Sequence, residues 1–313
     1  MNATPFAELS PDFVLDAVAA LGYDPDGRLL ALNSFENRVY QVGIEGDAPL
    51  IAKFYRAGRW SDAAIREEHA FTQELAEAEL PVVAPLLIDG ETLFDFDTQR
   101  LAVFPRRGGR APELEGLEVA QWLGRLIARI HAVGARSRFA ERERINVELR
   151  VRRSAQQVLA SALLPSHLVS RYQHLTADIA TILDQRFDAV RPHTLRLHGD
   201  CHPGNLLWTD AGPHFVDLDD AATGPAIQDL WMLMSGDEAQ QAALLEGYGE
   251  FRDLDPGELA LIEPLRIMRQ LHHAAWIATR YDDPAFPRAF PFAAEARWWE
   301  EHCNDLMRWL EDH

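Results

Sequence analysis

Four oxygen-bearing side chains lie close together between Leu197 and Asp220, in the stretch LHGDCHPGNLLWTDAGPHFVDLDD. Asp200 and Asn205 fall in a loop rich in turn-forming residues, whereas Asp217 and Asp219 follow an apolar run typical of a strand. Carboxylate and amide oxygens bind hard divalent cations such as Mg²⁺, which keep several waters and are usually completed by substrate phosphates. This stretch therefore favours phosphoryl transfer.

Phosphoryl transfer requires that phosphate charge is neutralised, that the acceptor hydroxyl is held in line, and that its proton is accepted. Asp200 is the candidate for orienting and deprotonating the acceptor, and Asn205 with Asp217 is the candidate pair for holding Mg²⁺. Lys53, paired with Glu68, is the candidate for contacting nucleotide phosphates. Each residue alone is weak support, but the set in this order predicts a magnesium-nucleotide site.

The predicted pairing of Lys53 with Glu68 depends on where the two side chains point. A lysine within a strand commonly reaches solvent. At about 100° per residue, Glu68 shares one helix face with Ile65, Thr72 and Leu75, so it turns inward. A carboxylate on a buried face needs a cation, and Lys53 on the preceding strand is the nearest candidate in the sequence. The alternative is a boundary carboxylate that reaches water.

The elements that must position these residues divide into a strand-rich part and a helical part. The first part is predicted to contain a helix at 11–21, three antiparallel strands within 29–55, a helix at 61–80, and strands at 81–88 and 93–104. Apolar spacing predicts further helices over the following ranges: 119–134, two within 146–190, 227–247, 257–281 and 293–310. The chain is thus predicted to be an α+β protein.

Two lobes are expected for a chain of 313 residues. The segment FPRRGGR, with Pro105, Gly108 and Gly109, interrupts all periodicity and marks a connector. We predict an N-terminal lobe over 1–103, a hinge over 104–110 and a C-terminal lobe over 111–313.

The composition of the chain indicates which binding partners and which cellular compartment are to be expected. Lys+Arg 30 against Asp+Glu 49 gives a net charge of −19, which disfavours a nucleic-acid-binding surface. The two cysteines, Cys201 and Cys303, cannot build a disulfide framework, and a reducing compartment suits them. The start of the chain lacks the pattern of a secretory signal, and no apolar run approaches the roughly 20 residues that span a bilayer. A cytoplasmic monomer without a membrane partner is expected.

Two other kinds of site, a zinc centre and a P-loop, would have their own sequence patterns. A zinc site competes because His198, Cys201, His202 and His214 crowd the same region, but adjacent side chains such as those of Cys201 and His202 tend to point apart. His198 and His202 are better interpreted as braces of the loop. Neither GxGxxG nor GxxxxGK[ST] occurs, which excludes a P-loop, so any phosphate-covering turn must be LNSFENRVY with Ser34 or backbone amides.

The motifs HGDxHxxN at His198–Asn205 and DxDD at Asp217–Asp220 resemble the aminoglycoside and choline phosphotransferase clan, which has a protein-kinase-like two-lobe fold. Over nearly its whole length the chain is similar to the stress response kinase A family of bacterial serine/threonine protein kinases. The similarity includes the segments ALNSFENRVYQ, IAKFYR, AVFPRRGGR, FVDLDDAATGPAIQDLWML, LIEPLRIMR and DPAFPRAFP. The implied fold has a small antiparallel-sheet lobe with one main helix and a larger, mostly helical lobe.

The resemblance implies a role for each site residue. Asp200 is implied as the catalytic aspartate, with Asp217 as a second catalytic residue that binds Mg²⁺ together with Asn205. Asp219 is implied to assist at the metal. ATP binding is assigned to residues of three segments: Ser34 in the hairpin, Lys53 with Glu68, and Val103 with Phe104 at the hinge.

The expected activity is ATP- and Mg²⁺-dependent transfer of the γ-phosphate to a serine or threonine of a protein, including the chain itself. The clan motif equally permits a small acceptor of the aminoglycoside, choline or homoserine type. A nucleotide-binding module without turnover belongs to a different class, and the complete set of catalytic residues argues against it.

Overall fold

The structure is a computed structural model that describes residues 6–210, 212–234 and 237–313. The chain forms two compact units, each assembled from three segments. The first consists of Met1–Glu143, Leu195–Ala222 and Met232–Asp253, and the second of Arg144–Thr194, Thr223–Trp231 and Leu254–His313. The predicted hinge at 104–110 lies inside the first unit, and the division into lobes at that point stays a prediction.

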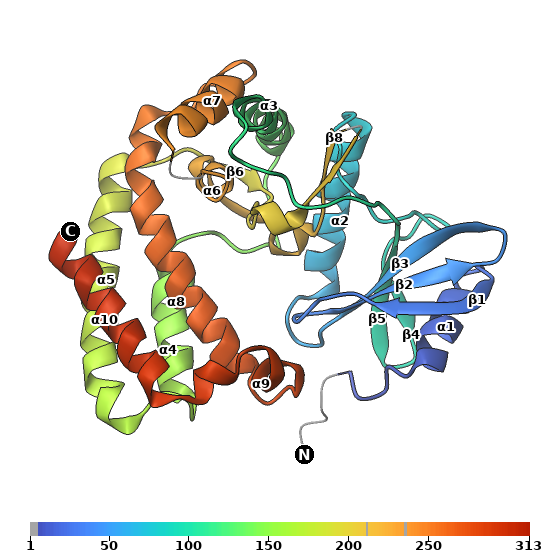
Figure 1. Cartoon of the computed structure of the whole chain (residues 1–313), viewed down its shortest axis with the longest axis horizontal. Coiled ribbons are helices and arrows are strands. Elements are labelled where there is room, and N and C mark those ends of the chain that lie inside the picture. Colours follow the sequence, from blue (N-terminus) through green and yellow to red (C-terminus); the bar gives the residue numbers. More distant parts are fainter. Residues whose placement is uncertain (1–5, 211, 235–236) are drawn as a thin grey trace. The chain divides into compact units, whose positions relative to one another are not determined.

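The first unit contains a five-stranded antiparallel sheet in the order β1-β2-β3-β5-β4 (Figure 1). Its strands have the following bounds: β1 Pro25–Ala31, β2 Arg38–Ile44, β3 Asp47–Tyr55, β4 Phe94–Phe96 and β5 Gln99–Pro105. Lys53 of β3 pairs with Val39 of β2 on one side and with Ala102 of β5 on the other. The lysine is therefore held in the centre of the sheet.

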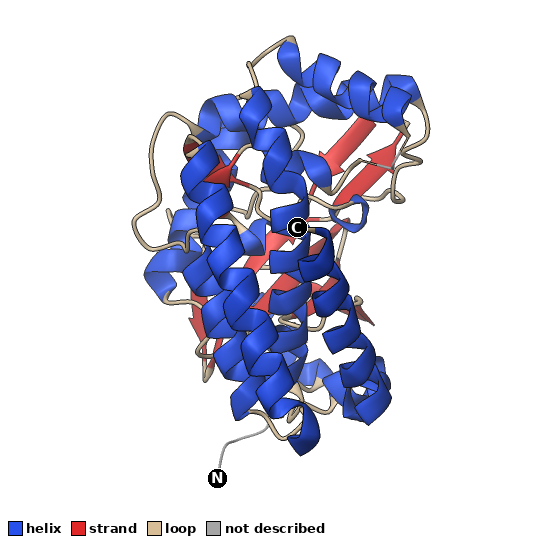
Figure 2. Cartoon of the chain, turned by 90° about the vertical axis from the view of Figure 1, so that its left-hand side faces the viewer, coloured by secondary structure: helices blue, strands red, loops and turns tan. Residues whose placement is uncertain are grey.

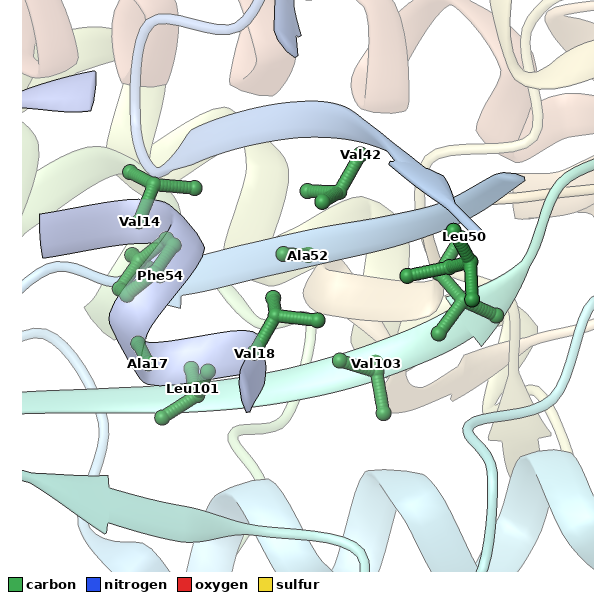
Figure 3. Close-up of a cluster of buried hydrophobic side chains, with 10 residues drawn as sticks. Val14, Ala17, Val18, Val42, Leu50, Ala52, Phe54, Leu101 and Val103 are labelled. Atoms are coloured by element: carbon green, nitrogen blue, oxygen red, sulfur yellow. The ribbon is translucent and has the colours of Figure 1, made fainter. Parts of the chain in front are cut away.

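The two faces of this sheet are covered by different helices because side chains alternate along each strand. Helix α1 (Pro11–Ala20), capped by Ser10, packs its valines on one face, where Figure 3 shows them over β2, β3 and β5. The strand residues in this cluster include Ala52, Phe54, Leu101 and Val103. Ala102 and Tyr55 belong instead to a second cluster with Ile65 of helix α2 (Asp62–Glu77). By alternation, Lys53 lies on the α2 face.

Two strand predictions in this region need correction. The predicted strand 93–104 is split into β4 and β5 by a tight turn in which Asp97 has a φ of 52°. The predicted strand 81–88 is wrong, because the segment forms only isolated bridges, such as Val82 to Phe215. Pro81 and Pro85 lack the backbone N–H groups that a continuous ladder requires.

The rest of the first unit consists of two packed helices and the short strands around the candidate site. Helices α3 (Leu117–Gly134) and α7 (Glu238–Gly249) pack closely on each other. The short strands are β6 Thr194–Leu197, β7 Leu206–Thr209 and β8 Gly212–Phe215, with 3₁₀ turns at Pro203–Asn205 and Leu218–Asp220. Strand β9 (Ala222–Pro225) begins at the end of the first unit's second segment.

The predicted helix 227–247 is wrong as a single element. The structure has α6 (Ile227–Trp231) and α7 instead, with residues 235–236 outside the described part of the chain. Asp237 starts α7 as its N-cap, since its side chain accepts a hydrogen bond from the backbone N–H of Ala239 at 2.7 Å.

The second unit is mostly helical, as the secondary-structure colouring of Figure 2 makes plain. Besides α6, its helices are α4 (Arg153–Ala160), α5 (Val169–Val190), α8 (Ile262–Arg280), α9 (Ala285–Ala289) and α10 (Ala296–Asp312). A π-helical turn (Glu148–Arg152) and 3₁₀ turns (Ser166–Leu168, Pro256–Leu261 and Pro291–Ala294) connect them. In the described part of the chain no helix is both long and apolar enough to cross a membrane.

Candidate active site

The loop from His198 to Asn205 is braced by hydrogen bonds among its own residues. Asn205 Nδ2 donates to the backbone oxygen of Asp200 at 2.9 Å, and the His202 N–H donates to the same oxygen at 2.9 Å. His202 Nε2 lies 3.4 Å from Asp200 Oδ2, while His198 Nε2 lies 3.0 Å from the backbone oxygen of Val216. The structure thus brings Asp200 and Asn205 together and confirms His198 and His202 as braces of the loop.

Gly199 allows this loop to approach the DxDD turn. Its φ is +86°, in the left-handed region that favours glycine, and a Cβ at this position would lie 2.1 Å from the backbone oxygen of Asp220. No other residue fits there without moving the backbone. The glycine therefore sets the spacing between Asp200 and the turn at Asp217–Asp220, called the acidic turn below.

Asp217 sits at the sharp entry to that turn. Its φ of 59° and ψ of 61° are left-handed, which ends the β8 run and starts the 3₁₀ turn Leu218–Asp220. Its side chain is 55% exposed, whereas that of Asp219 is only 6% exposed. Two aspartates that look equivalent in the motif thus have different environments.

Lys53 is the cation that faces both aspartates. Its Nζ lies 2.8 Å from Asp217 Oδ1 and 3.3 Å from Asp219 Oδ1, and its side chain is 9% exposed. Burial works against the charged form, but Asp217 and Asp219 raise the pKa of Lys53 well above its ordinary value. The side chain of Lys53 does not reach solvent, so the interpretation of Lys53 as a solvent-exposed strand lysine is wrong.

The predicted ion pair between Lys53 and Glu68 is not formed. Glu68 is buried on the inner face of α2, as predicted, but its Oε1 accepts a hydrogen bond from Thr72 at 3.0 Å and its Oε2 lies 3.6 Å from His69 Nε2. Lys53 forms ion pairs with Asp217 and Asp219 instead, because the acidic turn brings both carboxylates close to its ammonium group. Burial raises the pKa of the Glu68 carboxyl to about 7, an effect that Lys53 opposes.

The three other residues predicted to bind ATP, Ser34, Val103 and Phe104, lie in different structural environments. The Ser34 hydroxyl donates to the backbone oxygen of Asn37 at 3.1 Å, which closes the β1–β2 turn. The Val103 side chain is buried in the cluster beneath α1, and its backbone oxygen accepts from Leu86 N–H at 2.8 Å. Phe104 packs in the α2-facing cluster, on the Lys53 side of the sheet. Their roles in nucleotide binding stay predictions, and the burial of Val103 leaves only its backbone for such a role.

Three further residues contact the acidic turn, and the sequence does not predict their contacts. Asn37 Nδ2 donates to Asp219 Oδ2 at 3.1 Å, and Arg59 Nη2 donates to Asp220 Oδ1 at 2.6 Å while Arg59 Nη1 binds Asp219 Oδ2. Arg142 donates to the backbone oxygens of Asp219 and Ala221. Loop arginines are usually solvated, so a separation of 160 positions between Arg59 and Asp219 left no signal of their contact.

Asp219 is the most heavily bound carboxylate of the site. Burial works against its charged form, but Arg59 and Lys53 outweigh burial and hold the pKa of Asp219 below its usual value. The same contact raises the pKa of Arg59, although burial opposes it.

The donor set fits a hard divalent cation better than zinc. Asp217 offers an exposed carboxylate, and Asn205 offers an amide oxygen while its amide nitrogen is bound to Asp200. Within residues 6–210, 212–234 and 237–313, no group of three or more His, Cys, Asp or Glu side chains is arranged to hold a metal ion. Cys201, one of the possible zinc ligands, is buried.

Comparison with known proteins agrees with this geometry. Residues 28–262 match the phosphotransferase enzyme family (APH). The chain is 42% identical over 312 residues to stress response kinase A of Salmonella choleraesuis (strain SC-B67), covering 98% of this chain and 94% of that protein. The serine/threonine protein kinase RdoA of Salmonella typhimurium (strain LT2) gives the same identity and coverage.

A solved structure shares the fold. Amicoumacin kinase hAmiN, in complex with AMP-PNP, Ca²⁺ and Ami, superposes with a TM-score of 0.74 at 20% identity and covers 96% of this chain and 95% of that one. The predicted α+β, protein-kinase-like fold is thereby confirmed. The chain belongs to the phosphotransferase enzyme family and, within it, to the stress response kinase A family of kinases.

Proposed function

We propose that this protein transfers the γ-phosphoryl group of ATP to a serine or threonine hydroxyl of a protein substrate, in the presence of Mg²⁺. The observation that carries the proposal is the convergence of Lys53 on Asp217, at 2.8 Å, beside the loop that holds Asp200 and Asn205. The protein acceptor is supported by the 42% identity to a relative named as a serine/threonine protein kinase.

Each residue has a role that follows from its chemistry. Asp200 accepts the proton of the acceptor hydroxyl, and Asp217 with Asn205 holds the metal ion. The ammonium group of Lys53 leaves Asp217 and binds the nucleotide phosphates when ATP is bound. It is suited to this role because it is buried and its pKa is well above the ordinary value, which keeps it charged. Ser34 and the backbone at Val103 and Phe104 bind the nucleotide. A metal ion held by Asp217 and Asn205 would supply positive charge that neutralises the nucleotide phosphates.

The test is phosphate transfer from labelled ATP, with Mg²⁺, to a generic protein substrate and to the chain itself. Asp200→Ala should lower kcat by at least a hundredfold, because a positioned base contributes about 10²–10⁴ in rate. Asp217→Asn should lower kcat to a similar extent, because it removes a ligand of the metal ion that neutralises phosphate charge. Asp210→Asn, an exposed aspartate of the β7–β8 turn, is the matched control and should retain activity.

Three results would contradict the proposal. Phosphate transfer that persists in Asp200→Ala would show that Asp200 is not the catalytic base. Phosphate that reaches only members of a panel of small alcohols would replace the protein acceptor by a metabolite. ATP binding without transfer to any acceptor would indicate a nucleotide-binding module.

A further inference from the structure

Arg59 is the least expected charge of the site. It lies in the loop between β3 and α2, and its guanidinium bridges two consecutive carboxylates, with Nη1 on Asp219 and Nη2 2.6 Å from Asp220 Oδ1. The side chain is 14% exposed. A guanidinium that binds two carboxylates through separate N–H groups fixes both orientation and distance.

The loop around Arg59 is itself held in place. Two guanidinium groups lie against the Trp60 ring, with the central carbon of Arg59 at 5.4 Å and that of Arg142 at 3.9 Å from the ring centroid. Arg142 Nε donates to the backbone oxygen of Ala221 at 2.9 Å, and its Nη2 binds the backbone oxygen of Asp219. The side chains of Asp219 and Asp220 and the backbone of the turn thus bind two arginines that share one tryptophan.

Both carboxylate oxygens of Asp219 already face donors. Oδ2 binds Arg59 and accepts from Asn37 Nδ2 at 3.1 Å, while Oδ1 lies 3.3 Å from Lys53 Nζ. A metal ion at Asp219 Oδ2 would have to displace a buried guanidinium, and one at Oδ1 would stand against the ammonium of Lys53. Separating a buried ion pair is strongly unfavourable. Asp217 is the more exposed carboxylate and is bound to Lys53 through Oδ1.

We infer that Arg59 is a positioning residue of the phosphoryl-transfer site, and that Asp219 anchors the acidic turn to Arg59 instead of ligating the metal. Arg59 fixes Asp219 and Asp220, and the turn that they occupy sets the direction of Asp217 at its entry. This inference rests on the proposed function and changes the role that the motif implies for Asp219.

The test compares metal binding with turnover in the full chain. Mn²⁺ binding in the presence of AMP-PNP is measured by electron paramagnetic resonance for wild type, Asp217→Asn, Asp219→Asn and Arg59→Met. Asp217→Asn removes a metal ligand and should weaken Mn²⁺ binding at least tenfold. Asp219→Asn and Arg59→Met keep that ligand and only misdirect it, so they should weaken Mn²⁺ binding by no more than threefold. Both of the latter should lower kcat at least tenfold, with Arg59→Lys intermediate because it keeps the charge.

Two further measurements separate positioning from general loss of structure. Arg125→Met is the matched control, because Arg125 also makes a two-pronged ion pair, with Glu250 at 2.7 Å, in the same unit but outside the site. It should leave kcat within twofold. The double variant Arg59→Met/Asp219→Asn should be no slower than the slower single variant, because the two residues act as one unit.

The inference is overturned if Asp219→Asn loses Mn²⁺ as Asp217→Asn does, which would make Asp219 a metal ligand. It is equally overturned if Arg59→Met keeps the turnover of Arg125→Met, or if the two single effects multiply in the double variant. Absence of phosphate transfer by the wild type would instead contradict the proposed function, and the Mn²⁺ comparison would still decide the role of Asp219.

Discussion

The carboxylates of this site differ most in how far water reaches them. Asp217 is half-exposed and faces one lysine, Asp219 is buried between two cations, and Glu68 is buried beside Thr72 and His69. Burial opposes the charged form of both Asp219 and Glu68, but neighbouring cations lower the pKa of Asp219, whereas burial dominates at Glu68 and raises its pKa. Their residue type alone does not reveal these differences.

Glu68 makes the stability of the protein depend on pH. Its pKa is about 7 in the folded state against 4.5 ordinarily, so the folded state binds more protons between these values. Its contribution is fully present below pH 4.5 and is lost as the pH rises through 7. At 1.36 kcal/mol for each pKa unit, the loss is about 3 kcal/mol.

Glu68→Gln should remove this dependence, because glutamine imitates the neutral form. Urea unfolding of wild type and variant from pH 4.5 to 8, without metal, should give free energies of unfolding whose difference changes by about 3 kcal/mol. Glu77→Gln, at an exposed position of the same helix, is the control. Parallel curves for wild type and Glu68→Gln would contradict the prediction.

At the scale of elements, the packing of α3 on α7 depends on two glycines. A Cβ on Gly124 of α3 would lie 2.1 Å from the backbone oxygen of Leu244, and a Cβ on Gly247 of α7 would lie 2.1 Å from that of Gln121. The backbones approach so closely that either side chain would push the helices apart. This close contact also allows His131 Nδ1 to lie 3.0 Å from the hydroxyl of Tyr248.

Gly124→Ala and Gly247→Ala should each lower the free energy of unfolding by about 1–3 kcal/mol, the usual cost of overpacking. The double variant should lose less than the sum of the two, since the first separation makes room for the second methyl group. Gly249→Ala is the control, because among the described residues no heavy atom beyond its chain neighbours and its own helix backbone lies within 4 Å of its Cβ position. Urea unfolding measures all four variants, and full additivity would show that the two contacts are independent.

At the scale of the whole molecule, the candidate site is assembled from distant parts of one unit. The sheet brings Lys53, the β1–β2 turn brings Asn37, and the stretch after β6 brings Asp200 and Asp217. All of them belong to the first unit, which the chain leaves and re-enters twice. Ligand binding should therefore stabilise the fold that joins these segments.

Mg²⁺ with AMP-PNP, at roughly 100 times the dissociation constant, should raise the free energy of unfolding by about 2.7 kcal/mol. Thermal unfolding with and without the ligands shows this as a rise in Tm. Asp217→Asn should lose the rise, whereas Asp210→Asn should keep it. An equal rise in Asp217→Asn would contradict the role proposed for that aspartate.

The amino-acid sequence by itself determined the class of fold, most helices and the inward direction of Glu68. These features depend on periodicity, caps and turn residues within short windows of the chain. The order Asp200, Asn205, Asp217 was likewise readable, because two neighbouring motifs between Leu197 and Asp220 contain all three. The strand predicted at 81–88 failed, since two prolines outweigh apolar composition there.

Only the tertiary structure decided which charges meet. Lys53 contacts Asp217 and Asp219 instead of Glu68, and Arg59 reaches Asp219 across 160 positions of sequence. Ion-pair partners depend on distances of a few ångströms and on burial, both of which arise when distant segments pack together. A local pattern predicts that a buried carboxylate needs a cation, but the packed fold selects the cation.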